Sequence, residues 1–251
     1  MSTTQNDNST LIQRLFSAGA HFGFRKSRRH PTVTPYLYAT KDGVDIFDLE
    51  KTTSALEEAK EVLKQAGLTG KTVLFVGTKD ESSKLVRAAA EHAKSPFVTN
   101  RWIGGMITNF SEIKKRINRL EALMQEKESG ELERKYTKKE RVLIGREIEK
   151  LSFNFAGISS LTKNPDMMLV VDPRHDEIAV AEAVAMNIPV VAVMGSDCDA
   201  SKITYPVVAN DSLQASVNLL VSELAAAYEE GAAAYVPKPS TRESRPRRVA
   251  A

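Results

Sequence analysis

The sequence has a single cysteine, Cys198, among its 251 residues. No internal disulfide can therefore form, which is typical of proteins from a reducing compartment. The chain also lacks any run of about 18 consecutive apolar residues, so we expect no membrane-spanning helix and no membrane partner. The N-terminal stretch MSTTQNDNST has neither the basic nor the apolar region of a secretory signal. These absences predict a cytoplasmic protein.

Motifs for metal binding and catalysis are scarce as well. The four histidines are far apart in sequence, so a helical metal-binding pair is missing. Cys198 stands between Asp197 and Asp199, but one thiol is weak evidence for zinc. The chain contains no G-x-G-x-x-G and no G-x-S-x-G motif among its thirteen glycines. We predict no enzyme activity, no metal, no cofactor and no small-molecule substrate.

Two segments look like phosphate-binding loops. Gly70-Lys71-Thr72 has the end of such a loop, but Gln65 replaces the required glycine, and a predicted helix precedes the segment where a strand should. Gly77-Thr78-Lys79 does follow a predicted strand and precede a helix, where anions bind. It is either a simple turn or an anion site, for a nucleotide or for an RNA phosphate. A competing hypothesis is thus an α/β enzyme that uses this loop and Asp172, although Asp172 equally suits a role in pinning its own loop.

The pattern of apolar residues predicts an α/β fold. Apolar runs without polar alternation are typical of parallel strands buried on both faces, and they occur at 72–77, 167–172 and 189–194, with a short apolar segment at 205–209. Helical spacing is found between them, at 50–66, 80–93, 176–186 and 212–230. Strands that alternate with helices over short loops indicate a doubly wound, mainly parallel sheet.

The first fifty residues and residues 111–151 stand outside this alternation. Upstream we predict a helix from Ser9 or Thr10 to Ala18, a basic loop to Pro35, and a β-hairpin formed by 36–40 and 44–49. Residues 111–151 carry nine acidic and twelve basic side chains and divide at Ser129-Gly130. They predict two antiparallel helices in a coiled-coil hairpin, which either projects toward a partner or lies against its own sheet.

Positive charge is concentrated in two places. The net charge is only +3, yet Arg25, Lys26, Arg28 and Arg29 fall within five residues, and residues 237–251 carry five cations against one Glu. Basic clusters on a nearly neutral body favour a polyanionic partner that is met at defined points. For the tail alone, a merely solubilising role is an equal alternative.

Two loops combine aromatic and basic residues. GAHFGFRKSRRHP (19–31) places His21, Phe22 and Phe24 beside the four cations. Aromatic rings stack on unpaired bases and Arg pairs with phosphates, so the segment suits RNA. NRWIGGMITNF (100–110) joins Arg101 and the only tryptophan to a glycine pair. Trp102 is either a core anchor or part of an RNA-facing loop.

Seven motifs resemble those of a known family. They are GAHFG (19–23), LEKT (49–52), LFVGTK (74–79), RWIGGMITN (101–109), KLSFNFAGI (150–158), PDMMLVVD (165–172) and IPVVAV (188–193). They occur in the family's order, and RWIGGMITN is highly specific. On these motifs the chain resembles the bacterial type of small-subunit ribosomal protein number two.

The resemblance implies a flavodoxin-like α/β domain with an inserted helical hairpin, in agreement with the pattern above. It implies a structural constituent of the small ribosomal subunit that binds small-subunit rRNA near the junction of head and body. Neighbouring small-subunit ribosomal proteins are implied as partners, including the largest one, which the family helps to dock for translation. The implied location is the bacterial cytoplasm, bound to the ribosome.

The chain departs from the family pattern in three loops. Phe24-Arg25 stand where the family has His-Gln, so a metal site that uses this histidine is not carried over, and a Trp-Asn-Pro stretch of the family is replaced around His30-Pro31. Gly195-Ser196-Asp197 replaces Asp-Thr-Asn, and Val208-Ala209 replaces Pro-Gly. These changes leave the predicted sheet intact and alter loops that would meet RNA.

The predicted organisation has four parts. They are a flexible N-terminus (1–8), an α/β domain (9–110 and 152–232), an inserted helical hairpin (111–151) and a basic flexible C-terminal tail (233–251). The residues predicted to bind RNA are Arg25, Lys26, Arg28, Arg29, Lys79, Arg101, Trp102, Gly104, Gly105, Asn109, Lys114 and Lys115.

Overall fold

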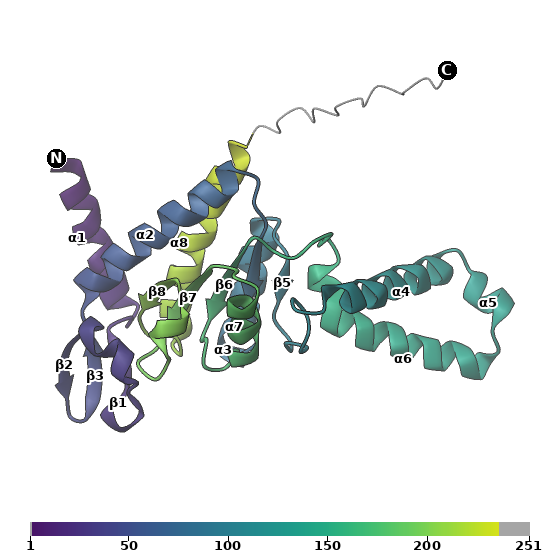
Figure 1. The fold of residues 1–251 in the computed structure, drawn as a ribbon, viewed down its shortest axis with the longest axis horizontal. Helices are drawn as coiled ribbons and strands as arrows, with labels where there is room; N and C mark the ends of the chain where they lie inside the picture. The colour runs from purple at the N-terminus through teal and green to yellow at the C-terminus, as the bar shows by residue number, and fades with distance from the viewer. Residues whose placement is uncertain (1, 236–251) are drawn as a thin grey trace, which may run out of the picture.

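The computed structural model describes residues 2–235 and is built around a five-stranded parallel sheet (Figure 1). The strands lie in the order β5 (Phe97–Val98), β4 (Val73–Val76), β6 (Met167–Val171), β7 (Val190–Met194) and β8 (Tyr205–Val208). Numbered by sequence, this order is 2-1-3-4-5, which is the order of flavodoxin-like doubly wound sheets. The predicted α/β class and the predicted core strands are confirmed. β5 was not predicted, because two residues carry no usable periodicity.

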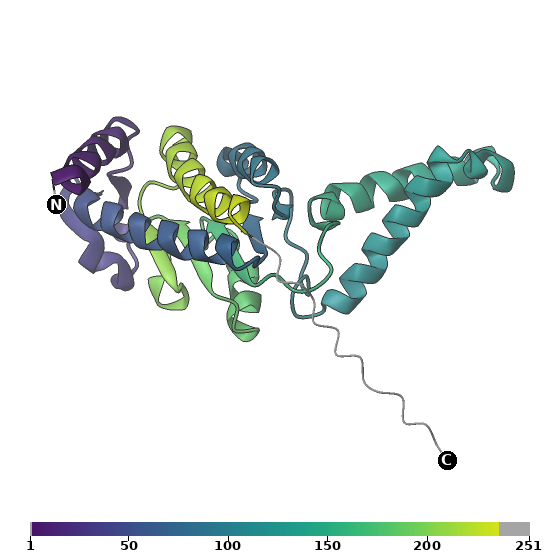
Figure 2. The same ribbon diagram turned by 90° about the horizontal axis from the view of Figure 1, so that it is seen from above.

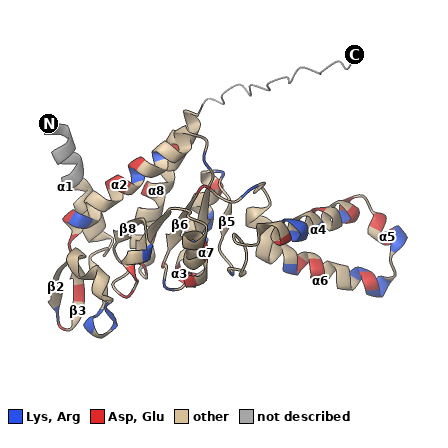
Figure 3. Ribbon diagram, viewed as in Figure 1, with Lys and Arg blue, Asp and Glu red and all other residues tan. Residues whose placement is uncertain are grey.

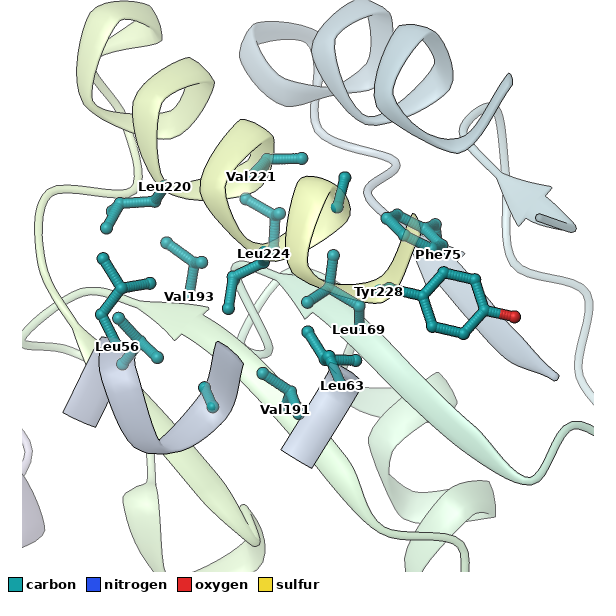
Figure 4. Packing of buried hydrophobic residues seen from close by; sticks show 14 of the residues in the cluster. Leu56, Leu63, Phe75, Leu169, Val191, Val193, Leu220, Val221, Leu224 and Tyr228 are labelled. Carbon is teal, nitrogen blue, oxygen red and sulfur yellow. The ribbon is translucent and has the colours of Figure 1, made fainter. Parts of the chain in front are cut away.

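Both faces of the sheet are covered by helices. One face packs against α2 (Leu49–Leu68), α3 (Asp80–His92) and α8 (Gln214–Ala233), and the other against α7 (Glu177–Ala185). Figure 4 shows Leu56 of α2 beside Val193 and Leu63 of α2 beside Val191 and Leu169, with Leu224 of α8 between these strand residues. Alternate residues of each strand belong to the two cores, which explains why the strands are apolar throughout.

Helices α2 and α8 cross with unusually close backbones (Figure 2). A Cβ added at Gly67 would lie 2.5 Å from the backbone nitrogen of Ala232, and one added at Gly231 would collide with the carbonyl oxygen of Lys64. Glycine is therefore needed at both positions for the two helices to reach this distance.

The N-terminal region differs from the prediction in two respects. Helix α1 (Ser2–Ser17) begins before Ser9, and the segment expected to be a basic loop contains a strand, β1 (Phe22–Arg25). β1 pairs with β3 (Val44–Phe47), which also pairs with β2 (Leu37–Lys41) in a three-stranded antiparallel sheet. The prediction of a loop at 22–25 was wrong because the partner strand lies about twenty residues away, beyond any local signal. The predicted β2–β3 hairpin is confirmed.

Short 3₁₀ helices complete the connections, at η1 (Lys26–Arg28), η2 (Pro31–Tyr36), η3 (Ala156–Ile158) and η4 (Ala200–Lys202). Within residues 2–235, no helix has the length and apolar character needed to cross a membrane. The predicted basic tail from residue 236 onward lies outside the described residues.

The segment inserted between β5 and β6 extends away from the sheet (Figures 1 and 2). It consists of α4 (Phe110–Glu128), the short α5 (Glu131–Lys135) and α6 (Lys138–Phe155). Three helices therefore occupy a region where two were predicted. Gly130 has a φ of +72°, which ends the first helix at the predicted break. α4 and α6 lie side by side over a small apolar cluster of their own, formed by Leu120, Leu123, Leu132, Ile144 and Ile148.

Candidate nucleic-acid interface

The turn after β1 presents exposed cations. Arg25 ends the strand and Lys26 begins η1, and both side chains are exposed, with no ion pair to either within residues 2–235. The backbone N–H of Lys26 donates to the carbonyl oxygen of Gly43 at 2.9 Å, which ties the turn to the β2–β3 hairpin. Figure 3 shows this basic turn on the small sheet. The geometry presents two unpaired cations on a fixed backbone.

Arg28 is held at the rim of the main sheet. Its Nη2 donates to Oδ2 of Asp197 at 2.8 Å, and its guanidinium lies over the ring of Phe24, 4.4 Å from the centroid. Arg174 donates to the same carboxylate oxygen at 2.6 Å. Each Arg side chain is 53% exposed, so both keep N–H groups open to a ligand.

Arg29 has a different role from its neighbours. Its Nε donates to Oδ2 of Asp45 at 2.8 Å, and its Nη2 donates to Oδ1 of the same carboxylate. Asp45 is fully buried, and the hydrogen bond from Arg29 holds the pKa of its carboxyl below the ordinary value. Asp45 needs this partner because an unpaired buried carboxylate is costly. Arg29 thus stabilises the small sheet in place of the predicted phosphate contact.

A cleft of about 470 Å³ opens at the carboxyl ends of the strands, where β4 and β6 lie side by side. Nζ of Lys79 is 2.9 Å from Oδ2 of Asp172 and donates to the hydroxyl of Ser212 at 3.1 Å. Asp172 also accepts the backbone N–H of His175 at 3.1 Å, which is the predicted pinning of its own loop. Lys79 and Asp172 therefore satisfy each other, and Lys79 is only 17% exposed.

The loop before α3 is filled by a side chain of the protein. Thr78 donates its backbone N–H to Oδ2 of Asp176 at 3.1 Å and its hydroxyl to Oδ1 at 2.6 Å. Burial raises the pKa of Asp176. The N–H that could hold a phosphate at this helix start already holds a carboxylate. Of the alternatives for Gly77-Thr78-Lys79, the structure favours a structural turn.

Three potential metal ligands gather behind this cleft. One donor atom each of Asp172, Cys198 and Asp211 lies within 4.8 Å of the others, and all three residues are buried. Burial raises the pKa of the Cys198 thiol far above its ordinary value and that of Asp211 to about 7. Lys79 neutralises Asp172, and Asp211 accepts the N–H of Gly195 at 2.8 Å. Both carboxylates of this cluster therefore already have partners within the protein.

The RWIGGMITN segment wraps around one carboxylate of α7. Glu182 accepts five hydrogen bonds, of 2.8 to 3.1 Å, from Nε1 of Trp102, the N–H groups of Gly105, Ile107 and Thr108, and the hydroxyl of Thr108. Burial alone would raise the pKa of Glu182, but these donors lower it below the ordinary value. Trp102 is 7% exposed, so it is a core anchor rather than part of an RNA-facing loop. Gly105, with a φ of +85°, lets the loop turn toward the carboxylate.

The remaining predicted residues surround the base of the insertion. Arg101 and Gly104 are exposed, and Asn109 is exposed at the N-cap of α4. Nζ of Lys114 donates to the carbonyl oxygen of Leu161 at 3.1 Å, so it pins the chain after η3. Lys115 is exposed and forms an ion pair with Glu112 at 2.6 Å. The exposed cations among the predicted residues thus fall into two groups, one on the small sheet and one at the insertion.

Sequence reasoning missed the carboxylates that organise these loops. Asp45, Glu182 and Asp197 are buried, and each holds N–H groups from segments far away in sequence. For Asp45 and Glu182 the sequence signal is an acidic residue inside an apolar element, such as Glu182 in EIAVAEAVA, whereas Asp197 lies in a polar turn and lacks even this signal. Such a pattern predicts that the carboxylate is buried, but it does not predict which N–H groups will donate hydrogen bonds to it.

Comparisons with known proteins all find the same family. The profile of the family described as Ribosomal protein S2 matches residues 15–231. The chain is 41% identical to the small ribosomal subunit protein uS2 of Petrotoga mobilis over 88% of its own length and 76% of that protein. It is 40% identical to the protein of the same name from Dictyoglomus thermophilum, covering 88% and 89%. It is 37% identical to uS2c of Emiliania huxleyi, covering 89% and 97%.

Proposed function

Because this chain belongs to the ribosomal protein S2 family, a family of structural constituents of the small ribosomal subunit, we propose that it binds small-subunit rRNA near the junction of head and body and helps dock the largest small-subunit protein. The observation that carries the proposal is the pair of exposed cations Arg25 and Lys26, which have no ion pair among the described side chains and lie on a turn fixed to the small sheet. Cations on a rigid frame bind phosphates at defined positions. The half-exposed Arg28 extends the basic surface beside this turn, and the exposed Arg101 adds a separate cation at the base of the insertion.

The proposal includes the location and the partners expected of the family. The protein works in the bacterial cytoplasm, bound to the ribosome beside other small-subunit proteins. α4 and α6 form an antiparallel coiled-coil hairpin that reaches a neighbouring component. Exposed Val142 and Leu143 of α6 support this, because neighbouring apolar side chains left in solvent mark contact surfaces.

The α/β enzyme hypothesis has less support. The cleft at the strand ends is lined by three cations and three carboxylates, so it carries no net positive charge for a phosphate. Lys79 and Asp172, the two groups on which that hypothesis depends, are paired at 2.9 Å. A binding role on RNA therefore agrees better with the chemistry of the exposed groups than a reaction in this cleft does.

The RNA proposal is tested by salt-dependent sedimentation and binding. The full chain should co-migrate with the small subunit through a sucrose gradient in moderate salt. The double variant Arg25→Gln/Lys26→Gln should bind rRNA more weakly, with a salt slope lower by roughly one unit for each phosphate that is no longer neutralised. Lys84→Gln/Lys94→Gln, which removes two exposed cations outside the proposed interface, is the control. Equal slopes for the two variants would show that Arg25 and Lys26 face solvent on the ribosome.

A surface for the protein partner lies beside the small sheet. Phe16, His21 and Phe22 form an aromatic patch, in which the rings of Phe16 and His21 stack at 4.4 Å and those of His21 and Phe22 lie 4.0 Å apart. Phe16 and Phe22 are 61% and 50% exposed. Clustered exposed aromatic residues are typical of protein-binding hot spots.

Docking is tested with the purified largest small-subunit protein. Phe16→Ala/Phe22→Ala should weaken its binding by at least tenfold, since removing one aromatic anchor typically costs about 2 kcal/mol. Phe153→Ala, which removes a ring 61% exposed at the opposite edge of the main sheet, should leave docking unchanged. Equal weakening in both variants would argue against a specific aromatic patch.

A further inference from the structure

A second cleft, of about 380 Å³, lies where α6 ends against the edge strand β5. Phe97 and Phe153 contribute aromatic rings to its lining, Asn100 and Asn154 contribute amides, and Arg87 contributes a guanidinium. The neighbouring Gly157 packs so tightly on Phe97 that an added Cβ would collide with the Phe97 carbonyl oxygen. The wall of the cleft is therefore fixed by backbone packing before any ligand arrives.

Phe153 is the prominent apolar group of this cleft. Its side chain is 61% exposed, whereas Phe155, two residues later, is buried in the core beneath the sheet. Phe155 therefore supplies the aromatic ring that the core needs at this turn, and Phe153 is not required for packing. A large aromatic ring left in solvent and beside a cleft is more often a contact residue than a packing residue.

The two amides are held with hydrogen-bond acceptors available. Nδ2 of Asn100 donates to the carbonyl oxygen of Phe153 at 2.6 Å, and Nδ2 of Asn154 donates to the carbonyl oxygen of Lys150 at 3.0 Å. Each bond uses an amide N–H, so each side chain keeps its carbonyl oxygen as an acceptor. Amide groups beside an aromatic ring are the usual means of reading the edge of a stacked base.

The charge around the cleft favours a phosphodiester. None of the residues that line it is acidic. The guanidinium of Arg87 lies over the ring of Phe97, 5.7 Å from its centroid. Its Nε donates to Glu91 at 2.8 Å, and its two NH₂ groups have no hydrogen-bond partner among the described residues. Arg101, next to Asn100 in the chain, is exposed and has no ion pair within the described residues. A nucleotide therefore finds both a ring for its base and cations for its phosphate.

We propose that this cleft receives one unpaired nucleotide of RNA, whose base stacks on Phe153 while Arg87 and Arg101 face its phosphates. The proposal rests on the RNA-binding function above and adds to it a second contact point, at the opposite end of the sheet from the basic turn. It also states the kind of RNA recognised there, namely a bulged or looped-out nucleotide, because a base inside a duplex cannot reach a ring in a cleft.

The test compares Phe153→Ala, Phe153→Leu and Phe153→Trp in the full chain, with purified small-subunit rRNA as the probe. Phe153→Ala should weaken binding about tenfold, as stacking on one aromatic side chain typically contributes. The salt slope should stay that of the wild type, since no charge is removed. Phe153→Trp should restore binding and Phe153→Leu should not. Zero-length ultraviolet crosslinking should join the peptide containing residue 153 to an unpaired nucleotide.

Phe16→Ala is the matched control, because Phe16 is the same residue type with the same exposed fraction of 61%. It should leave rRNA affinity unchanged, and circular dichroism should show that all variants are folded. Wild-type binding to rRNA combined with an unaltered Phe153→Ala affinity would overturn this inference alone. Full rescue by Phe153→Leu would likewise overturn it, because the contact would then not be stacking. A wild-type chain that binds rRNA no better than unrelated RNA would overturn the proposed function itself.

Discussion

Replacing Glu182 by glutamine tests how the loop of residues 102–108 is held. Oε1 accepts from Trp102 and Gly105, and Oε2 accepts from Ile107 and from both donors of Thr108. Glutamine has one acceptor oxygen, so either orientation turns an NH₂ group toward two N–H donors. Each orphaned buried donor costs about 1–3 kcal/mol. Glu182→Gln should therefore lower the free energy of unfolding by about 2–6 kcal/mol.

Urea unfolding followed by circular dichroism measures this destabilisation. The fluorescence of Trp102, the only tryptophan, reports on the same loop and should shift to the red as the indole N–H loses its partner. Glu177→Gln is the control on the same helix, since Glu177 is 72% exposed and forms only a 3.7 Å ion pair with Lys202. That variant should stay within about 0.5 kcal/mol of the wild type. A Glu182→Gln protein as stable as this control, with unchanged emission, would refute the assigned role of the carboxylate.

Two further predictions concern buried groups. Burial raises the pKa of Asp211 to about 7, whereas an unfolded Asp titrates near about 3.9. The folded state thus binds more protons, and the stability from this group, complete below about pH 4, falls by on the order of 1 kcal/mol per pH unit as the pH rises toward about 7. Asp211→Asn should lack this dependence, so urea melts should show the variant gaining stability relative to the wild type between about pH 5 and about pH 8. A difference in unfolding free energy that is the same at both pH values would contradict the assignment. Gly231→Ala should destabilise by about 3 kcal/mol because α2 and α8 must separate, whereas Gly145→Ala, with open space around it in α6, should stabilise by up to about 1 kcal/mol. Equal effects in urea melts would show that the helix crossing tolerates a methyl group.

The sequence predicted the sheet well because its signal is local. MMLVV and VVAVM are apolar at every position, and such runs are strands buried on both faces regardless of what surrounds them. The strand at 22–25 gave no such signal, since two 3₁₀ helices, strand β2 and a turn separate it from its partner Val44–Phe47. Register and pairing between distant strands are properties of the folded chain that no window of sequence contains.

The candidate site was predicted only in part, for an electrostatic reason. Charge density along the chain located the basic turn, but it could not separate Arg25 from Arg29, four residues apart. The difference is made by Asp45, which lies on another strand and binds one of them. In the same way, the sequence predicted Lys79 to bind RNA, but in the fold its ammonium group is paired with Asp172, which follows the neighbouring strand β6. How much of a cation is open to RNA therefore depends on the carboxylates that the fold brings to it.

The close crossing of α2 and α8 has a consequence for how the chain is made. α2 occupies residues 49–68 and its partner α8 occupies residues 214–233. The ribosome therefore synthesises α2 long before α8. Until α8 leaves the ribosome, the apolar faces of α2 and of strands β4, β6 and β7 lack their cover. We therefore expect the nascent chain to stay open until α8 emerges, and to need protection from aggregation until then.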